Sequence, residues 1–316
     1  MVPPIERQVG ARRIRRILPF GCKRAAWAPA AFYSEAHTLP TRTSRIPGYG
    51  DVNLAVDFVG DSRATPVILL HGGGQTRHAW GTAARALAER GYQALTVDSR
   101  GHGDSDWSPA LDYSMKAYVA DLMSIIQCVD TQPVLVGASM GGQIAMTTAA
   151  EHPTAIRALV LVDVTPRVDR EGRARILGFM RSHPQGFANF EEAADAISEY
   201  LPHRPRPTDL SGLKRNLRLR EDGRYHWHWD QRFLATYEPD ADEAEQRYTE
   251  AARGIRVPTL LLRGSQSEVV TMENVSHFRK LIPHAEFLDV QGAAHMLAGD
   301  RNDAFNAAVI EFLERH

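Results

Sequence analysis

The feature that most constrains the fold is the segment 134–150, where an apolar stretch, a glycine-flanked serine and a small-residue run follow one another. Val134-Leu135-Val136 is typical of a buried strand, and the run after Gln143 is typical of a helix. Between them lies G-x-S-x-G, with Ser139 at its centre. A serine at such a strand–turn–helix elbow has a strained backbone, which requires glycine two residues away on each side. The pattern predicts a nucleophile above the carboxyl edge of a sheet, with the Met140 N–H facing a developing oxyanion.

Strand-like and helix-like segments alternate on both sides of this elbow. Short apolar strands are predicted at 67–70, 92–97, 133–138, 156–162, 257–264 and 285–290, after a hairpin at 42–59. Helices are predicted at 79–90, 113–129, 272–281 and 303–314. This order predicts an α/β fold with a mostly parallel central sheet and helices on both faces.

The alternation stops between 165 and 252, a proline-containing stretch with helical patterns near 169–182, 190–200 and 240–253. We interpret this stretch as a helical cap inserted into an α/β core formed by 41–164 and 253–316. Residues 1–40 form a separate N-terminal extension.

Composition limits the classes of partner. The chain has 316 residues, of which 43% are hydrophobic and 24% charged, and its formal net charge of −1 does not indicate nucleic acid. No apolar run reaches the roughly 18 residues that a membrane span needs. The two cysteines suggest a reducing compartment, so we expect the cytoplasm. Residues 1–45 contain nine Arg or Lys and two acids, which leaves a targeting segment open as an alternative to an unneeded extension. The sequence does not indicate an oligomeric state.

A serine nucleophile needs a histidine base, which in turn needs a carboxylate to fix its tautomer. At elbows of this kind the acid and then the histidine follow the serine along the chain. His295 lies in the Gly/Ala-rich loop between the last predicted strand and the closing helix, where the base is expected. The turn after 257–264 offers Glu268 as the acid, and Asp163, after the strand that follows the elbow, is the alternative.

The second oxyanion donor is expected in the loop after strand 67–70. That loop reads His71-Gly72-Gly73-Gly74, and its glycines let the backbone approach a substrate oxygen closely. We predict the Gly73 N–H as the donor and the Gly74 N–H as the second choice. His71 is predicted to have a structural role that holds the loop in place. The polar segment 98–105 is interpreted as a hydrogen-bonded brace between loops.

The predicted cap contains an unusual run, Tyr225-His226-Trp227-His228-Trp229-Asp230. Two histidines alone do not make a metal site, since no cysteine lies nearby and no third ligand stands at helical spacing. No metal is therefore expected, and the tryptophans are interpreted as a wall over the pocket or an anchor for the cap.

Together these pieces resemble the α/β-hydrolase superfamily. The resemblance covers about residues 45 to 316 and is carried by 71–74, 98–105, 137–142, 263–268 and 292–295. It implies an α/β-hydrolase fold, a Ser–His–acid triad, an oxyanion hole and no cofactor. Arg-Gly-His-Gly-Asp-Ser is similar to the epoxide hydrolase, lactonase and haloperoxidase-like branch, but Ser139 replaces the Asp nucleophile of epoxide hydrolases. Glu268 departs from the family pattern, in which Asp is usual.

A serine nucleophile forms an acyl-enzyme, so the expected substrate is a small acyl compound. The first hypothesis is a carboxylic ester or lactone hydrolase. A C–C bond hydrolase of a dienoic ketone, or a cofactor-free perhydrolase, would use the same triad with a different pocket. A non-catalytic ligand receptor built on the same fold is the alternative from another class.

Overall fold

The computed structural model describes residues 41–202, 206–236, 240–295 and 302–316. The predicted extension at 1–40 lies outside the described residues, so its role stays a prediction. Within those described ranges, no helix combines the length and the apolar character needed to cross a bilayer.

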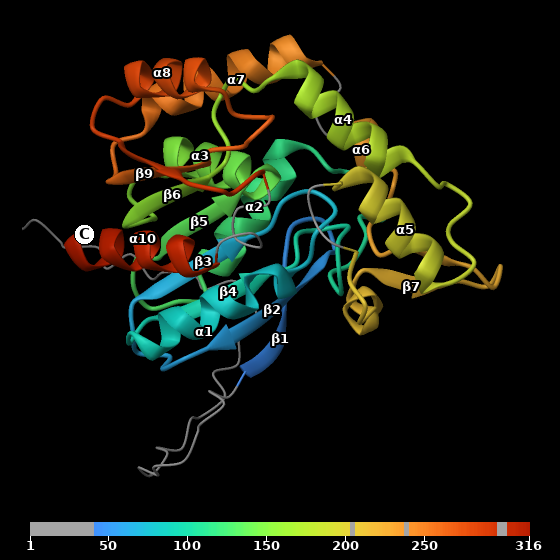
Figure 1. Cartoon of the computed structure of the whole chain (residues 1–316). Helices are drawn as coiled ribbons and strands as arrows, with labels where there is room; N and C mark the ends of the chain where they lie inside the picture. The colour runs from blue at the N-terminus through green and yellow to red at the C-terminus, as the bar shows by residue number, and fades with distance from the viewer. Residues whose placement is uncertain (1–40, 203–205, 237–239, 296–301) are drawn as a thin grey trace, which may run out of the picture. The chain divides into compact units, whose positions relative to one another are not determined.

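A single eight-stranded sheet organises the core, in the order β1-β2-β4-β3-β5-β6-β9-β10 (Figure 1). Its strands are β1 (Thr41–Pro47), β2 (Asn53–Val59), β3 (Pro66–Leu70), β4 (Gln93–Val97), β5 (Val134–Ala138), β6 (Ala158–Val162), β9 (Thr259–Gly264) and β10 (Glu286–Val290). The β1–β2 and β2–β4 pairs are antiparallel, and all other pairs are parallel. The predicted N-terminal hairpin and the mostly parallel sheet are both confirmed.

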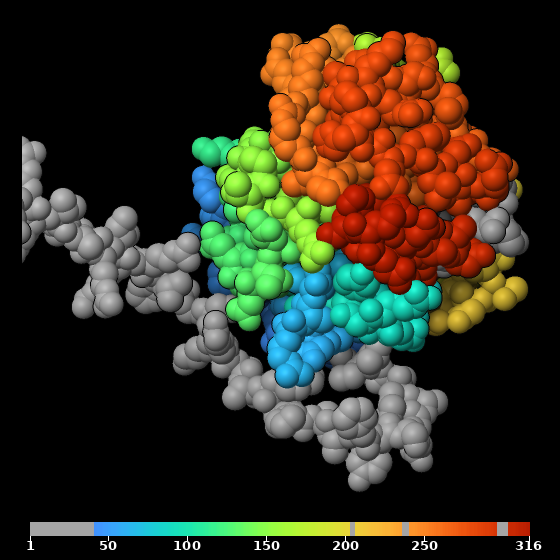
Figure 2. Space-filling model, turned by 90° about the vertical axis from the view of Figure 1, so that its left-hand side faces the viewer, coloured from blue at the N-terminus to red at the C-terminus, as the bar shows by residue number. Residues whose placement is uncertain are grey.

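Both faces of the sheet are buried, as the apolar strand sequences require. In β3, Val67 and Leu69 belong to one apolar cluster, while Ile68 and Leu70 belong to the other. The helices on the first face are α1 (Gly81–Glu89), preceded by the short η1 (Arg77–Trp80), and α10 (Asn302–Arg315), which contacts α1 (Figure 2). Those on the other face are α2 (Met115–Ile126), α3 (Met140–Glu151), α7 (Ala241–Gly254) and α8 (Met272–Leu281) (Figure 1).

Local capping sets where several helices begin. The predicted helix at 113–129 starts at Met115, because the Ser114 side chain accepts a hydrogen bond from the Ala117 N–H. Helix α8 begins with a reciprocal capping box between Thr271 and Asn274. The polar residue Ser114 therefore explains why α2 begins two residues later than periodicity predicted.

The chain order creates a crevice at the carboxyl edge of the sheet. Strand β3 lies between β4 and β5, and the chain leaves β3 toward α1 on one face and β5 toward α3 on the other. Loops that diverge in this way leave an opening beyond the strand ends, which is where open α/β sheets place their ligands.

The described residues of the segment 165–252 add no strand to the central sheet. It contains α4 (Arg170–Arg181), α5 (Phe190–Tyr200), η2 (Ser211–Arg215), β7 (Leu217–Leu219), β8 (Tyr225–Trp227), α6 (Phe233–Thr236) and most of α7. The sequence did not predict the small β7–β8 hairpin, since three-residue strands are too short to show alternation. Helix α7 packs on α3 and α8, so the last helix of the predicted cap covers the sheet (Figure 1).

Candidate active site

Ser139 lies between β5 and α3 with φ 48° and ψ −118°. This left-handed backbone is rare for a residue with a side chain and is typical of strained functional turns. A Cβ on Gly137 would lie 2.4 Å from the Gly141 carbonyl oxygen, and a Cβ on Gly141 would lie 2.4 Å from that of Leu70. Both positions therefore require glycine for steric reasons. The chain makes the sharp turn that the G-x-S-x-G pattern predicted.

His295 follows β10 and faces a carboxylate. Its Nδ1 lies 2.7 Å from Oδ2 of Asp163, the residue directly after β6. The Asp163 side chain is fully buried, whereas that of His295 is 20% exposed. In a neutral imidazole, a carboxylate that accepts from Nδ1–H selects the tautomer whose Nε2 carries the free lone pair, and Nε2 is the atom that acts as a base in serine hydrolases.

Asp163 is held by further hydrogen bonds. Its Oδ1 accepts from the Gly264 N–H at 3.1 Å, and its Oδ2 accepts from the Ser267 hydroxyl at 2.6 Å. These bonds satisfy a charge that would otherwise be costly to bury. Sequence reasoning missed Ser267, because a hydroxyl in a turn carries no distinctive signal.

The preferred acid, Glu268, is not the carboxylate that the structure joins to His295. Its side chain is 61% exposed and forms an ion pair with Arg175 of α4. In the turn after β9, Ser267 rather than Glu268 reaches inward, and it meets Asp163. The structure therefore brings His295 together with the alternative acid.

The glycine loop after β3 lies beside the serine. A Cβ on Gly72 would be 3.3 Å from the Cβ of Ser139, so the loop and the elbow are in close contact. The Gly74 N–H, the second choice as oxyanion donor, already donates to Nε2 of His102 at 3.1 Å and is not available. Within the described ranges the Gly73 N–H has no hydrogen-bond partner, and Met140 is the first residue of α3. Gly73 and Met140 thus remain the candidate donors.

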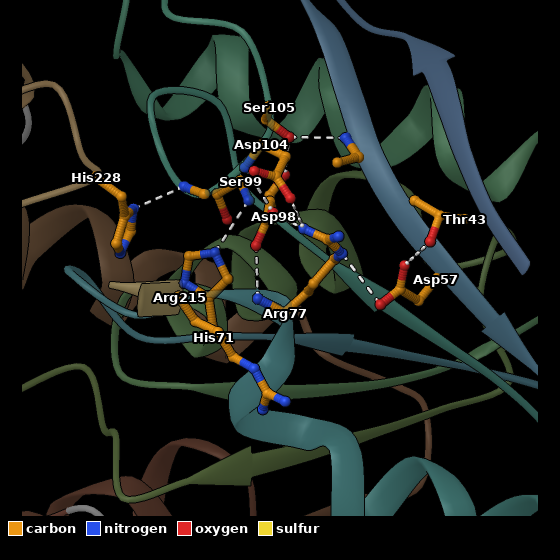
Figure 3. A network of polar contacts seen from close by, with 12 residues as sticks. Thr43, Asp57, His71, Arg77, Asp98, Ser99, Asp104, Ser105, Arg215 and His228 are labelled. Atoms are coloured by element: carbon orange, nitrogen blue, oxygen red, sulfur yellow. Dashed lines mark hydrogen bonds and ion pairs between the residues drawn. The ribbon is translucent and has the colours of Figure 1, made fainter. Parts of the chain in front are cut away.

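His71 and the segment 98–105 brace this loop. His71 is fully buried, and its Nδ1–H donates to the Gly72 carbonyl at 2.8 Å. Its Nε2 accepts from the Ser99 N–H at 3.0 Å, as Figure 3 shows. Burial lowers the pKa of His71, so the imidazole stays neutral. Asp98 accepts from the backbone N–H of Arg77 at 2.6 Å and forms an ion pair with its guanidinium (Figure 3). The predicted structural roles of both segments agree with these bonds.

A cavity of about 180 Å³ opens beside His295. Its walls come from α4, from the end of α5 and from the turn after β9, and they include Arg175, Ile176, Tyr200 and Val269. Apolar and charged groups thus share one cavity at the carboxyl edge of the sheet.

His226 and His228 do not converge on a common point. The Nε2 of His226 bonds Asp222 within the β7–β8 hairpin at 2.8 Å, whereas His228 bonds backbone groups of Gly103 and Gly74. In the part of the chain that the structure describes, no group of three or more His, Cys, Asp or Glu side chains is arranged to hold a metal ion.

The chain is similar in sequence to proteins named as a lipase and an esterase. The chain is 30% identical over 269 residues to the mouse protein named sn-1-specific diacylglycerol lipase ABHD11, covering 80% of this chain and 82% of the relative. It is 28% identical over 250 residues to Esterase Rv0045c of Mycobacterium tuberculosis, covering 75% and 79%.

Solved structures show the same fold. The crystal structure of E-2-(acetamidomethylene)succinate hydrolase superposes with a TM-score of 0.77 at 22% identity, covering 87% of this chain and all of that one.

The sequence model of a protein family described as alpha/beta hydrolase fold matches residues 65–301. This match extends over most of the sequence and includes Ser139, Asp163 and His295, so the chain belongs to the alpha/beta hydrolase fold family.

Proposed function

We propose that this chain is a serine hydrolase that cleaves a carboxylic ester or lactone through an acyl-Ser139 intermediate. The observation that carries the proposal is the 2.7 Å contact between His295 and the buried Asp163, at the same sheet edge as the Ser139 elbow. The names of the relatives, a lipase and an esterase, support ester bonds as the substrate class.

In the proposed mechanism, Asp163 fixes the tautomer of His295 and stabilises the imidazolium that forms. His295 accepts the Ser139 proton as the Oγ attacks the acyl carbon. The Gly73 and Met140 N–H groups donate to the oxyanion of the tetrahedral intermediate, and losing one such donor typically costs about 3 kcal/mol. His295 then donates the proton to the leaving alcohol, and a water molecule deacylates Ser139 by the same steps.

The cavity beside His295 is the proposed acyl or alcohol pocket. Arg175 and Glu268 form an exposed ion pair at its rim, from α4 and from the turn after β9, so Glu268 lies at the edge of the pocket and does not hold the base. A panel of esters and lactones with graded acyl length, read by product mass, measures what this pocket accepts. A vinylogous diketone in the same panel tests the C–C hydrolase hypothesis.

The test of the proposal is Ser139→Ala assayed on p-nitrophenyl acetate. We expect kcat to fall by a factor on the order of 10⁶, as removal of a triad nucleophile does in a serine protease. Ser276→Ala is the matched control, because among the described residues its hydroxyl bonds only the Met272 carbonyl within α8. Full activity in Ser139→Ala would contradict the proposal. Ligand binding without turnover, and without labelling by a fluorophosphonate, would favour the receptor hypothesis.

The cytoplasmic location stays a prediction.

A further inference from the structure

The His-Trp-His-Trp run in the segment 225–230 has no role in the chemistry above, yet two of its residues, His228 and Trp229, lie against the glycine loop. Three consecutive glycines have few intrinsic conformational preferences, so external contacts must fix the orientation of each peptide plane. The orientation of the Gly73 N–H matters most, because an oxyanion donor must already point at the reacting oxygen.

His71 fixes the first peptide plane, which joins Gly72 to Gly73. The Gly72 carbonyl accepts from the Nδ1–H of His71 at 2.8 Å and from the Gln75 N–H at 3.1 Å. In a trans peptide the N–H points opposite to the carbonyl. Fixing the Gly72 oxygen therefore fixes the direction of the Gly73 N–H.

His102 fixes the second plane, which joins Gly73 to Gly74. Its Nε2 accepts from the Gly74 N–H at 3.1 Å, and its Nδ1–H donates to the Arg100 carbonyl at 3.1 Å. The two bonds define one neutral tautomer. The ring centroid lies 5.2 Å from that of His71 and 5.9 Å from that of His228.

His228 fixes the third plane, which joins Gly74 to Gln75, and it does so from outside the core. Its Nε2–H donates to the Gly74 carbonyl at 3.2 Å. Its Nδ1 accepts from the Gly103 N–H at 2.7 Å, which is the dashed contact of His228 in Figure 3. The residue is 2% exposed. One cap imidazole thus bonds two separate core loops.

Packing holds the same run against the loop. A Cβ on Gly74 would lie 3.3 Å from Cζ3 of Trp229, whose ring is stacked on that of Trp227 at 5.0 Å. The Asp230 N–H donates to the Gly101 carbonyl at 2.8 Å, and Asp230 Oδ2 accepts from the Tyr113 hydroxyl at 2.6 Å. The two residues that follow His228 therefore anchor the run to the core.

We propose that His228 is a positioning residue by which the docked cap completes the oxyanion hole, the last of three histidines that each orient one peptide plane of Gly72-Gly73-Gly74. We call His71, His102 and His228 the loop histidines. This inference rests on the proposed function, in which the Gly73 N–H is an oxyanion donor. It assigns the aromatic–His run a part in catalysis without contact to the substrate.

The bonds of His228 need the neutral ring, because Nδ1 must accept while Nε2–H donates. The titratable and charged groups around it are His71 and His102 from the core, Asp104 from the 98–105 segment and Arg218 from β7. Burial, followed by the effect of His71, lowers the pKa of His228 to about 3. The arrangement therefore persists at neutral pH.

Two substitutions separate the two bonds. In His228→Gln the amide nitrogen replaces Nε2 and still donates to Gly74, whereas in His228→Asn the amide oxygen replaces Nδ1 and the bond to Gly74 is lost. We expect His228→Asn to lower kcat on p-nitrophenyl acetate about tenfold to a hundredfold with KM within about threefold, since small misplacements of a catalytic group have effects of this size. His228→Gln should stay within about threefold of the unmodified chain. His226→Gln is the matched control, because its ring bonds only Asp222 in the hairpin among the described residues.

Hydrogen–deuterium exchange of the peptide covering 71–76 gives a readout independent of turnover. We expect faster exchange in His228→Asn than in His226→Gln at equal thermal midpoint. Equal exchange and equal kcat in these two variants would overturn the inference. Equal losses in His228→Asn and His228→Gln, with lowered thermal midpoints, would also overturn it, because His228 would then only pack. An inactive unmodified chain would contradict the proposed function instead, and the exchange result would still decide whether His228 orders the loop.

Discussion

Replacing Asp163 by Asn tests the acid of the proposed triad with little change in shape. Asp163 has φ 49°, a left-handed conformation that Asn tolerates well, so the backbone has no reason to move. The Asn Oδ1 can still accept from the Gly264 N–H. The amide nitrogen then takes the place of Oδ2, which lies 2.7 Å from Nδ1 of His295 and 2.6 Å from the Ser267 hydroxyl.

This exchange reverses the tautomer of the base. An amide N–H facing Nδ1 makes Nδ1 an acceptor and puts the imidazole proton on Nε2, where it blocks proton transfer from Ser139. The equivalent substitution in a serine protease lowers kcat about 10⁴-fold, or about 5 kcal/mol in activation free energy. We expect a loss of this size on p-nitrophenyl acetate, largely in kcat.

Glu268→Gln is the matched control for this prediction. It removes an ion pair whose side chains are 45% and 61% exposed, and exposed pairs contribute about 0–1 kcal/mol. We expect its kcat to stay within about threefold of the unmodified chain. A large loss in Glu268→Gln together with nearly full activity in Asp163→Asn would refute the reasoning and restore Glu268 as the acid.

Three further outcomes follow from buried contacts. Gly137→Ala should fail to fold or lose most activity, measured by circular dichroism and ester turnover, because its Cβ would lie 2.4 Å from the Gly141 carbonyl oxygen. Arg100→Leu should lower the free energy of unfolding by about 3–5 kcal/mol in urea titrations, since Asp121 would lose its buried partner at 2.6 Å. The loop histidines have folded-state pKa values below 6.5, so only the unfolded chain takes up their protons as pH falls. The contribution of His228 is complete above pH 6.5 and declines toward about pH 3, by about 1.4 kcal/mol per pH unit, measurable as a falling urea midpoint.

Much of the core was predictable because its signals are local. Buried parallel strands appear in the sequence as short apolar runs. The predicted helix at 272–281 matches α8 at both ends, and the structure shows a capping box at its start. The Ser139 elbow was equally clear, since steric limits force glycine at fixed offsets. Such features depend on residues next to one another in the chain.

The acid and the loop histidines depend instead on contacts between distant segments. Asp163 and His295 are 132 residues apart, and the sequence does not reveal which of two carboxylates turns toward the base. His228 bonds a glycine 154 residues away, so the sequence indicated only that the aromatic–His run forms a wall over the pocket or anchors the cap. Periodicity predicts which face of an element is buried, but not which polar groups meet across a crevice.

The most direct measurement of the proposed mechanism is rapid-quench mass spectrometry during turnover of p-nitrophenyl acetate. An acyl-enzyme mechanism predicts that one acetyl group accumulates on the peptide carrying Ser139, and that the adduct disappears in Ser139→Ala together with turnover. Turnover at an undiminished rate in Ser139→Ala, or a transient acetyl group on any other side chain, would contradict it.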